Sequence, residues 1–156
     1  MDIKDYINEK PQMNFKEFFS GNLKACGIIQ NWRGKIISRF DLSMNGKWQG
    51  NNGILKENFK FYDGQKKNRL WKITKESQSR FIGEADDIIG KAYCEIKGNA
   101  CRSYYSMNIS VGKRSYKIKF DDWLWQMNNN VVINRSYMKK FGFTVAELTM
   151  FIEKEK

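Results

Sequence analysis

From Gly21 onward the sequence alternates between apolar and polar residues in short segments, and turn residues interrupt the alternation about every 8–12 positions. This spacing is typical of an all-β sandwich or barrel. About ten such segments follow one another through short links, without the long connections of a Greek key. The pattern therefore predicts an all-β fold, an up-and-down antiparallel β-barrel. The main turn signals are Asn45-Gly46, Asp63-Gly64, Gly98-Asn99, Gly112-Lys113 and Asn128-Asn129-Asn130.

The N-terminal stretch breaks this rhythm. Residues 1–18 predict a short helical lead, because Asp2 or Asp5 can cap a helix and Pro11 ends or interrupts it. We expect this lead to pack as a lid on one end of a single barrel domain that spans residues 19–156.

The C-terminal stretch fits two structures. Residues 144–147 read as a capping box that opens a helix. Residues 141–152 also alternate acceptably between apolar and polar side chains. Because a closed barrel needs a last strand, we predict a strand here.

The residue types present exclude several chemistries. The chain of 156 residues has no histidine, which removes a Ser-His-Asp triad, a Cys-His pair and a histidine metal site. The three cysteines lack metal-ligand spacing, and Asp86-Asp87 reads as a turn, so we expect no metal and no cofactor. Cys94 and Cys101 would face each other if the hairpin loop is Lys97-Gly98, and would not if it is Gly98-Asn99. Otherwise they are small buried residues in a reducing compartment.

The formal net charge of +11 makes an anionic partner worth considering. No nucleic-acid motif accompanies the lysines, so we interpret them mainly as solvated surface and consider nucleic acid an unlikely partner. No apolar run is long enough to span a membrane, and the first residues lack the apolar core of a signal peptide. As it stands, the chain is expected to be soluble and cytoplasmic. The densest group of cations is Lys60, Lys66, Lys67, Arg69, Lys72 and Lys75.

Strand parity places charged side chains among large apolar ones. Asp122 shares the face of Ile118 and Phe120, and a buried carboxylate costs several kcal/mol unless a donor or cation meets it. The same parity turns Glu57, Arg69 and Arg135 inward. We expect Arg69 to meet Glu57, and Arg135 to meet Asp122, as charge-assisted pairs. Such a neutralised polar core could also serve only to fix strand register.

The residues next to Asp122 fall on the opposite, outer face. Trp123 and Trp125 are expected to cover the outside of the barrel or to form a partner surface. If this strand phase is right, Asp122→Asn is expected to weaken folding or ligand retention, whereas Asp121→Asn is expected to be nearly silent.

A set of motifs along nearly the whole chain resembles the bacterial domain-of-unknown-function 3833 family. The motifs are Phe19-x-Gly21, Gly27, Gly34, Arg39-Phe40, Glu57-x-Phe59, Asp63-Gly64, Arg69-x-Trp71, Gly83-x-Ala85-Asp86-Asp87, Gly90-x-Ala92, Gly98-Asn99-Ala100, Asp121-Asp122-Trp123, Asn134-Arg135 and Phe141-Gly142. The resemblance implies a lipocalin-like barrel with no established activity. It also implies that a lipoprotein signal can precede such a chain, which would make the protein periplasmic or membrane-tethered.

These features favour a non-enzymatic barrel that binds a hydrophobic or amphiphilic small molecule, with an acyl chain and an anionic head. Arg135 and Tyr137 lie two apart on one strand and would hold the head, by analogy with fatty-acid-binding barrels. The first alternative is an enzyme that uses Asp122 or Glu57 as acid or base on a lipid-like ligand. The second is a basic surface for nucleic acid or an anionic membrane surface. The ligand-binding residues expected are Glu57, Arg69, Trp71, Tyr105, Asp122, Arg135 and Tyr137.

Overall fold

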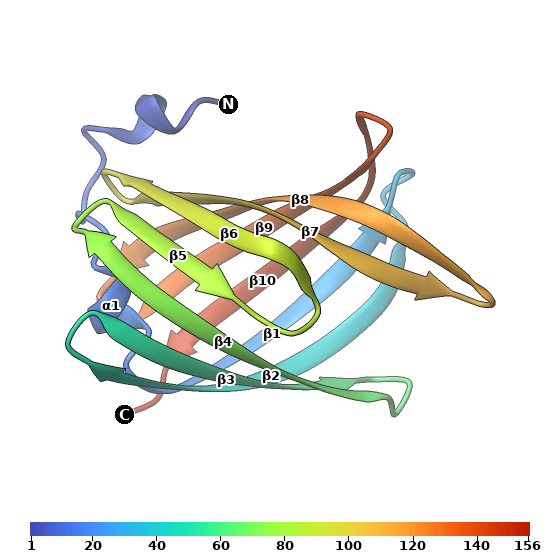
Figure 1. Cartoon of the computed structure of the whole chain (residues 1–156), viewed down its shortest axis with the longest axis horizontal. Coiled ribbons are helices and arrows are strands. Elements are labelled where there is room, and N and C mark those ends of the chain that lie inside the picture. The colour runs from blue at the N-terminus through green and yellow to red at the C-terminus, as the bar shows by residue number, and fades with distance from the viewer.

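Ten antiparallel strands close into one barrel in the computed structural model, which describes all 156 residues except for the side chain of Val111. Each strand pairs with its neighbours in the chain, and β1 closes the barrel against β10 (Figure 1). The barrel and the C-terminal strand predicted from the alternation are confirmed. The strands are β1 (Gly21–Asn31), β2 (Ile36–Gln49), β3 (Asn52–Phe61), β4 (Lys66–Ser77), β5 (Arg80–Glu84), β6 (Ile88–Lys97), β7 (Ala100–Val111), β8 (Arg114–Asn128), β9 (Val131–Lys140) and β10 (Phe143–Lys154).

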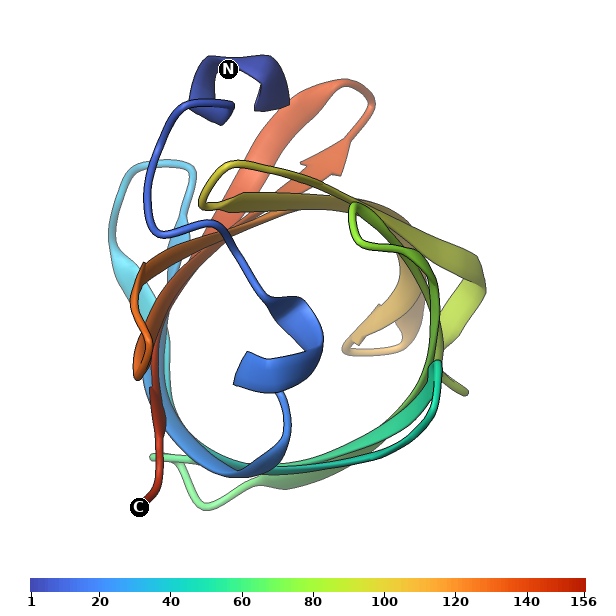
Figure 2. The same cartoon turned by 90° about the vertical axis from the view of Figure 1, so that its left-hand side faces the viewer.

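The helix α1 (Phe15–Phe18) lies across one end of the barrel (Figure 2). The side chains of Phe15, Phe18 and Phe19 are buried there and join the core that fills this half of the barrel. The five hairpin turns β1–β2, β3–β4, β5–β6, β7–β8 and β9–β10 lie at the opposite end, which we call the far rim (Figure 1).

The first turn of the chain packs elsewhere. The 3₁₀ segment η1 (Ile3–Tyr6) lies on the outer wall of the barrel, over the side chains of Trp123 and Trp125. Trp123 is fully buried, and its ring stacks on that of Trp125 at 5.7 Å between centroids. The two tryptophans therefore face outward as expected, but the chain's own N-terminal segment covers them. Within the described residues, no helix is long and apolar enough to cross a membrane.

One strong turn signal is overridden. Asn45-Gly46 lies inside β2, and the chain turns at Gly50-Asn51 instead. A Cβ atom at Gly46 would overlap the carbonyl of Phe19, so glycine is needed here to let the lid residues approach the strand. The contact with Phe19 therefore explains the glycine at position 46 better than a hairpin turn does.

The hairpin near the cysteines turns at Gly98-Asn99, with Lys97 opposite Ala100. Cys94 therefore pairs with Ser103 across the strands, and Cys101 with Ile96. Of the two registers considered from the sequence, this is the one that does not place the two cysteines directly opposite each other, and both are free.

Candidate ligand-binding site

Two adjoining cavities lie along the barrel axis. The smaller, of about 110 Å³, is under the lid and is lined by Phe15, Phe19 and mostly apolar wall residues. The larger, of about 480 Å³, extends toward the far rim, where Phe61 and Ile109 line it. Six residues border both cavities and so mark the boundary between them, namely Glu57, Trp71, Tyr105, Asp122, Asn134 and Met150.

Asp122 is held at this boundary by two donors. Asn134 donates from Nδ2 to Oδ1 at 2.6 Å, and the hydroxyl of Tyr105 donates to Oδ2 at 3.2 Å. Asn134 also donates to the backbone carbonyl of Trp123, which fixes its amide orientation. The carboxylate expected to need a partner thus meets two neutral side chains on the flanking strands β7 and β9.

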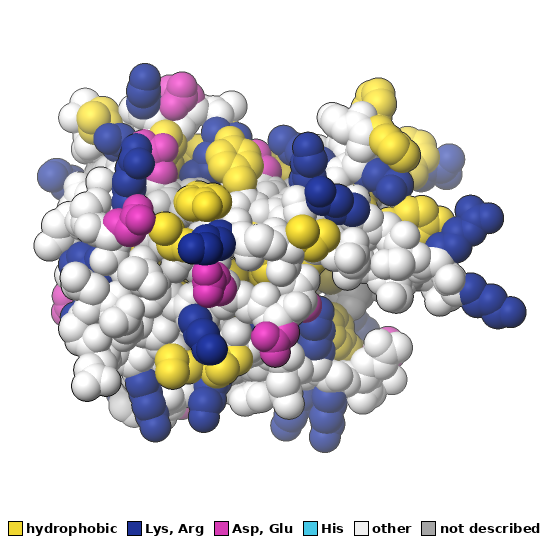
Figure 3. Space-filling model, in the orientation of Figure 1, with side chains coloured by type: hydrophobic (Ala, Val, Ile, Leu, Met, Phe, Trp, Pro, Cys, Tyr) yellow, Lys and Arg dark blue, Asp and Glu magenta, His cyan; other side chains and the backbone are white. Residues whose placement is uncertain are grey.

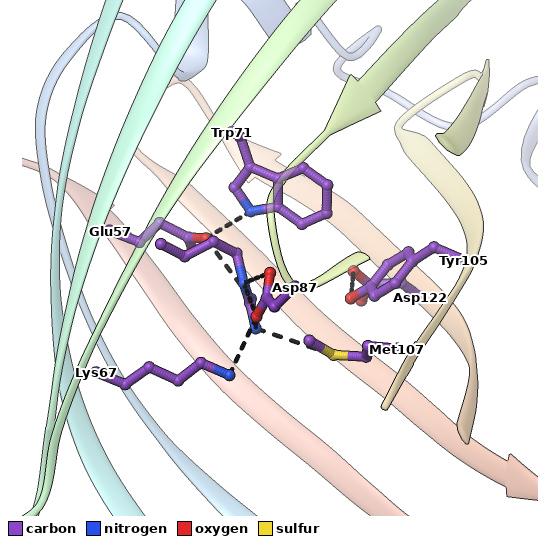
Figure 4. Close-up of polar contacts among 8 residues, drawn as sticks. Glu57, Lys67, Trp71, Asp87, Tyr105, Met107 and Asp122 are labelled. Carbon is purple, nitrogen blue, oxygen red and sulfur yellow. Dashed lines mark hydrogen bonds and ion pairs between the residues drawn. The ribbon is translucent and has the colours of Figure 1, made fainter. Parts of the chain in front are cut away.

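Glu57 on β3 and Arg69 on β4 form a second polar group. Figure 4 shows Glu57 with its neighbours Trp71 and Asp87. Trp71 donates from Nε1 to Oε1 of Glu57 at 2.6 Å, and the guanidinium of Arg69 lies 3.8 Å from the same oxygen. The closer partner of Arg69 is Asp87, which accepts from Nε and Nη2 at 2.9–3.1 Å. Lys67 also approaches Asp87, at 3.1 Å. Arg69 therefore does pair with Glu57 as expected, but its shorter contacts are those with Asp87.

Burial decides the charge of the two interior carboxyls. Removal from water raises the pKa of Glu57 to about 7, although Arg69 and Trp71 favour its ionised form. Burial also raises the pKa of Asp122 to about 6 against the hydrogen bonds from Asn134 and Tyr105. Asp87 behaves oppositely, because Arg69 and Lys67 outweigh its burial and lower its pKa.

Two residues expected in the interior lie outside it. On β9 the inward side chains are Asn134, Ser136 and Met138, so Arg135 and Tyr137 point to the outer wall. Arg135 sits opposite Trp123, and its guanidinium reaches the hydroxyl of Thr149 at 3.5 Å. The expected Arg135–Asp122 pair and the Arg135–Tyr137 head site are therefore wrong. The register between β8 and β9 shifts between Gln126 and Asn128, and such an irregularity inverts strand parity.

The structure places the other five expected residues in the barrel interior. Glu57, Arg69, Trp71, Tyr105 and Asp122 all line the larger cavity. Glu57, Arg69 and Trp71 lie on β3 and β4, whereas Tyr105 and Asp122 lie on β7 and β8. Both groups face the larger cavity.

Sequence reasoning missed three polar residues of the site. Asn134 and Ser136 lie on the face of β9 that parity assigned to the outside, and Asp87 was assigned only a turn role. Ser136 Oγ is among the buried side-chain atoms of the described chain that lack a protein partner. The Asp87 contact had a weak sequence signal, because Asp87 follows β5 in the turn to β6 and Arg69 lies near the start of β4, the strand that pairs with β5.

The arrangement offers hydrogen-bond acceptors inside an apolar tube. Glu57, Asp122 and Ser136 present oxygens to the cavity, while the charge of Arg69 is already shared with Asp87. Such a site can hold a molecule that has an apolar body and O–H or N–H donors. In the described part of the chain, no group of three or more Cys, Asp or Glu side chains is placed to hold a metal ion.

A closed antiparallel barrel with an axial cavity and a few convergent polar groups defines the lipocalin-like class of barrels. Within that class, the chain belongs to the DUF3833 family, described as a protein of unknown function, whose model matches residues 1–154. A comparison with curated protein sequences gave no match.

Solved structures share this fold at low identity. A protein of unknown function from the DUF3598 family of Nostoc punctiforme PCC 73102 is 11% identical with a TM-score of 0.67. The match covers 94% of this chain, which spans about half (51%) of that protein. The S-type phycobiliprotein lyase CPES from Guillardia theta is 6% identical, with a TM-score of 0.64 and 91% of each chain covered. At these identities the likeness concerns the fold alone.

Proposed function

We propose that the protein is a non-catalytic barrel that binds a small, mostly apolar molecule whose polar end carries O–H or N–H donors. The observation that carries this proposal is the cavity of about 480 Å³ with Glu57 and Asp122 at its inner boundary. A volume in the range of about 300–1,000 Å³ and a lining with few convergent polar groups are usual for small-molecule sites.

The walls of the larger cavity support an apolar ligand body. Between the far rim and the polar boundary the lining is dominated by aromatic and aliphatic side chains. A ligand that enters along the axis would bury its apolar length there before its polar end reached Asp122. The apolar lining residues are Ile29, Phe40, Phe59, Phe61, Met107, Ile109, Phe120, Met138 and Leu148.

The charges favour a donor-bearing head over the anionic head expected from the sequence. Arg69 is the interior arginine, and Asp87 already occupies its guanidinium at 2.9–3.1 Å. A carboxylate or phosphate placed beside Glu57 and Asp122 would be repelled once these groups ionise. A hydroxyl, amide or amine would instead donate to them, and a protonated amine would also be attracted.

The raised pKa values support a second candidate function, acid–base catalysis. A carboxyl that titrates near neutral pH beside an accessible cavity can transfer a proton to or from a bound molecule. Near neutral pH Glu57, with a pKa of about 7, is more often protonated and so available as a general acid, whereas Asp122, with a pKa of about 6, is mostly ionised and available as a general base. Both carboxyls are engaged by Trp71, Asn134 and Tyr105, which is why binding is the preferred function.

Native mass spectrometry of the purified protein, followed by organic extraction, tests the binding function directly. We expect a retained small molecule in the wild type and its loss in Ser136→Leu, because leucine would fill part of the cavity. Thr149→Leu on the neighbouring strand faces outward and is the matched control. An empty wild type, or equal retention in the two variants, would argue against the proposal.

The head-group preference has its own test. Dodecanol, dodecylamine and dodecanoate share a chain length and differ at the polar end. Each compound is titrated into the protein at pH 8, and binding is followed by the fluorescence of Trp71 and the other tryptophans. We expect the alcohol and the amine to bind at least about tenfold more tightly than the carboxylate. Preference for dodecanoate would restore the anionic head and overturn this part of the proposal. Conversion of the retained molecule on incubation, absent in Asp122→Asn, would establish catalysis instead.

A further inference from the structure

The far rim exposes large aromatic side chains at the tips of two hairpins. Trp32, in the β1–β2 turn, is 71% exposed, and Phe141 and Phe143, at the β9–β10 turn, are 86% and 76% exposed. Because β1 pairs with β10, these hairpins are neighbours (Figure 1). The start of β2 adds Ile36 and Ile37, which are also exposed. Exposed apolar groups gathered at one place usually mark an interaction surface.

Cations accompany these aromatic rings. The guanidinium of Arg33 lies 4.7 Å from the ring of Trp32, and Lys140 Nζ lies 4.6 Å from the ring of Phe141. The β7–β8 hairpin, next to β9–β10 around the barrel, adds Lys113 and Arg114. No ion pair of the described residues involves these four cations. Figure 3 shows basic and hydrophobic side chains together on the hairpins at the right of the molecule.

The neighbouring β3–β4 hairpin carries a weaker form of this combination. Tyr62 is 57% exposed beside Arg39. Lys66 and Lys67 follow at the start of β4, although Lys67 is paired with Asp87. On the other side of the far rim, the β5–β6 turn carries Glu84, Asp86 and Asp87. At the lid end, the turns centred on Gly50-Asn51 and Gly98-Asn99 are short and contain no aromatic residue. The three most exposed aromatic side chains of the described residues therefore lie, together with cations that form no ion pair there, on three consecutive hairpins, β1–β2, β9–β10 and β7–β8, which we call the basic aromatic rim.

We propose that the basic aromatic rim binds the surface of an anionic lipid bilayer. Aromatic rings settle at the boundary between lipid headgroups and acyl chains, and nearby Lys and Arg side chains are attracted to anionic headgroups. Trp32, Phe141 and Phe143 stand on hairpin tips, so they can enter a bilayer surface together. They do not line a groove along which a nucleic-acid strand could stack its bases, which makes nucleic acid the poorer occupant.

Docking of this rim would set the larger cavity facing the bilayer. The cavity extends toward the same end of the barrel, where Phe61 and Ile109 line it. This inference goes beyond the proposed binding function and does not depend on it, because the basic aromatic rim can bind a membrane surface whether or not the cavity contains a ligand.

Vesicle cosedimentation tests the inference. The wild-type chain should bind vesicles of phosphatidylcholine with phosphatidylglycerol at least about tenfold more strongly than vesicles of phosphatidylcholine alone. Binding should weaken as salt increases, because salt screens exposed charges. Equal binding to both kinds of vesicle, or binding to neither, would overturn the proposal, and this readout requires no variant to fold.

Two variants with matched controls locate the binding surface. The triple variant Trp32→Ala, Phe141→Ala, Phe143→Ala should lose most vesicle binding, whereas Tyr93→Ala, an exposed aromatic on the barrel wall, should not. The double variant Lys113→Glu, Arg114→Glu should bind roughly tenfold or more weakly than Lys47→Glu, Lys56→Glu, which makes the same change of net charge on the wall. Equal losses in variant and control would overturn the proposal. So would a concentration-dependent dimer lost only in the aromatic variant, which would assign the rim to a second copy of the chain.

Discussion

Asn134 Nδ2 donates to Oδ1 of Asp122 at 2.6 Å inside the barrel, and the same nitrogen donates to the backbone carbonyl of Trp123 at 2.8 Å. One amide thus satisfies a buried carboxylate and ties β9 to β8 at the level where the two cavities meet. Because Asp122 is buried, the stability of its ionised form depends on this neutral hydrogen-bond donor more than on any cation.

Replacing Asn134 by leucine removes the donor and leaves Asp122 with only the hydroxyl of Tyr105. We expect a loss of about 2–3 kcal/mol in the free energy of unfolding at pH 8, measured by urea denaturation, because a buried charged acceptor would lose its closest hydrogen bond. Arg135→Ala, the next residue, points outward and should cost at most about 1 kcal/mol. A larger effect from Arg135 than from Asn134 would contradict the inward position of Asn134.

The outcome on β9 shows where alternation stops being informative. On β2 one face holds Phe40, Leu42 and Met44 and the other holds polar residues, so the sequence alone assigns the inside. On β9 both faces mix apolar and polar side chains, because the outer face also packs, with Tyr137 near the covered Trp123. When the two faces of a strand do not differ in polarity, a single register shift inverts the inward and outward assignment of its side chains, and the sequence gives no sign of it.

The barrel itself was predictable, because its closure does not depend on which face of each strand points inward. Closure needs only the number of strands and short links, and an error of parity on one strand does not change either. The contacts of the N-terminal segment were not predictable, because they join residues far apart in sequence. Gly46 resembles a turn residue until the carbonyl of Phe19 is known to lie against it.

The pKa of Glu57 makes stability depend on pH. The folded chain holds the proton of Glu57 up to about pH 7, whereas the ordinary value is 4.5. Between these values the folded state binds more protons than the unfolded state, so stability falls as pH rises from about 4.5 to 7. For Glu57 the change is on the order of 3 kcal/mol, and Asp122 adds a change of the same sign below about pH 6.

Glu57→Gln should remove the Glu57 part of this dependence. The amide cannot ionise, so we expect a variant that is more stable than the wild type at pH 8 and a flatter profile between pH 5 and 7, followed by thermal unfolding. Glu84→Gln, an exposed acid, is the control and should keep the wild-type profile. An unchanged slope in Glu57→Gln would show that another group carries the proton.

Asp121 is expected to matter although it points away from the barrel interior. Arg102 donates to both of its carboxylate oxygens at 2.8–2.9 Å, and Lys139 lies at 3.4 Å, so neutralising it should not be silent, contrary to the sequence-based expectation. These cations outweigh burial and lower its pKa, so the stability it contributes is present above its ordinary value of 3.8 and is lost as pH falls through the lower, folded value.

Asp121→Asn should therefore cost about 2 kcal/mol at pH 7 in urea denaturation, because two charge-assisted hydrogen bonds are weakened. Asp63→Asn, in an exposed turn, should change stability by no more than about 0.5 kcal/mol. If the two variants behaved alike, the ion pair between Asp121 and Arg102 would contribute nothing measurable.

The lid can be tested through the close approach at Gly46. A Cβ atom there would meet the carbonyl of Phe19, so Gly46→Ala must push the lid residues off the end of β2. Trp48 reports this movement, because its Nε1 donates to the same carbonyl at 3.1 Å. We expect a loss of about 1–3 kcal/mol in the free energy of unfolding, together with a change in tryptophan fluorescence in the folded state. Asn45→Ala alters the preceding, exposed side of the strand and should leave the fluorescence unchanged. A Gly46→Ala variant with wild-type stability and spectrum would mean that the lid is not held against β2 in solution, and that the smaller cavity beneath it is open at this end.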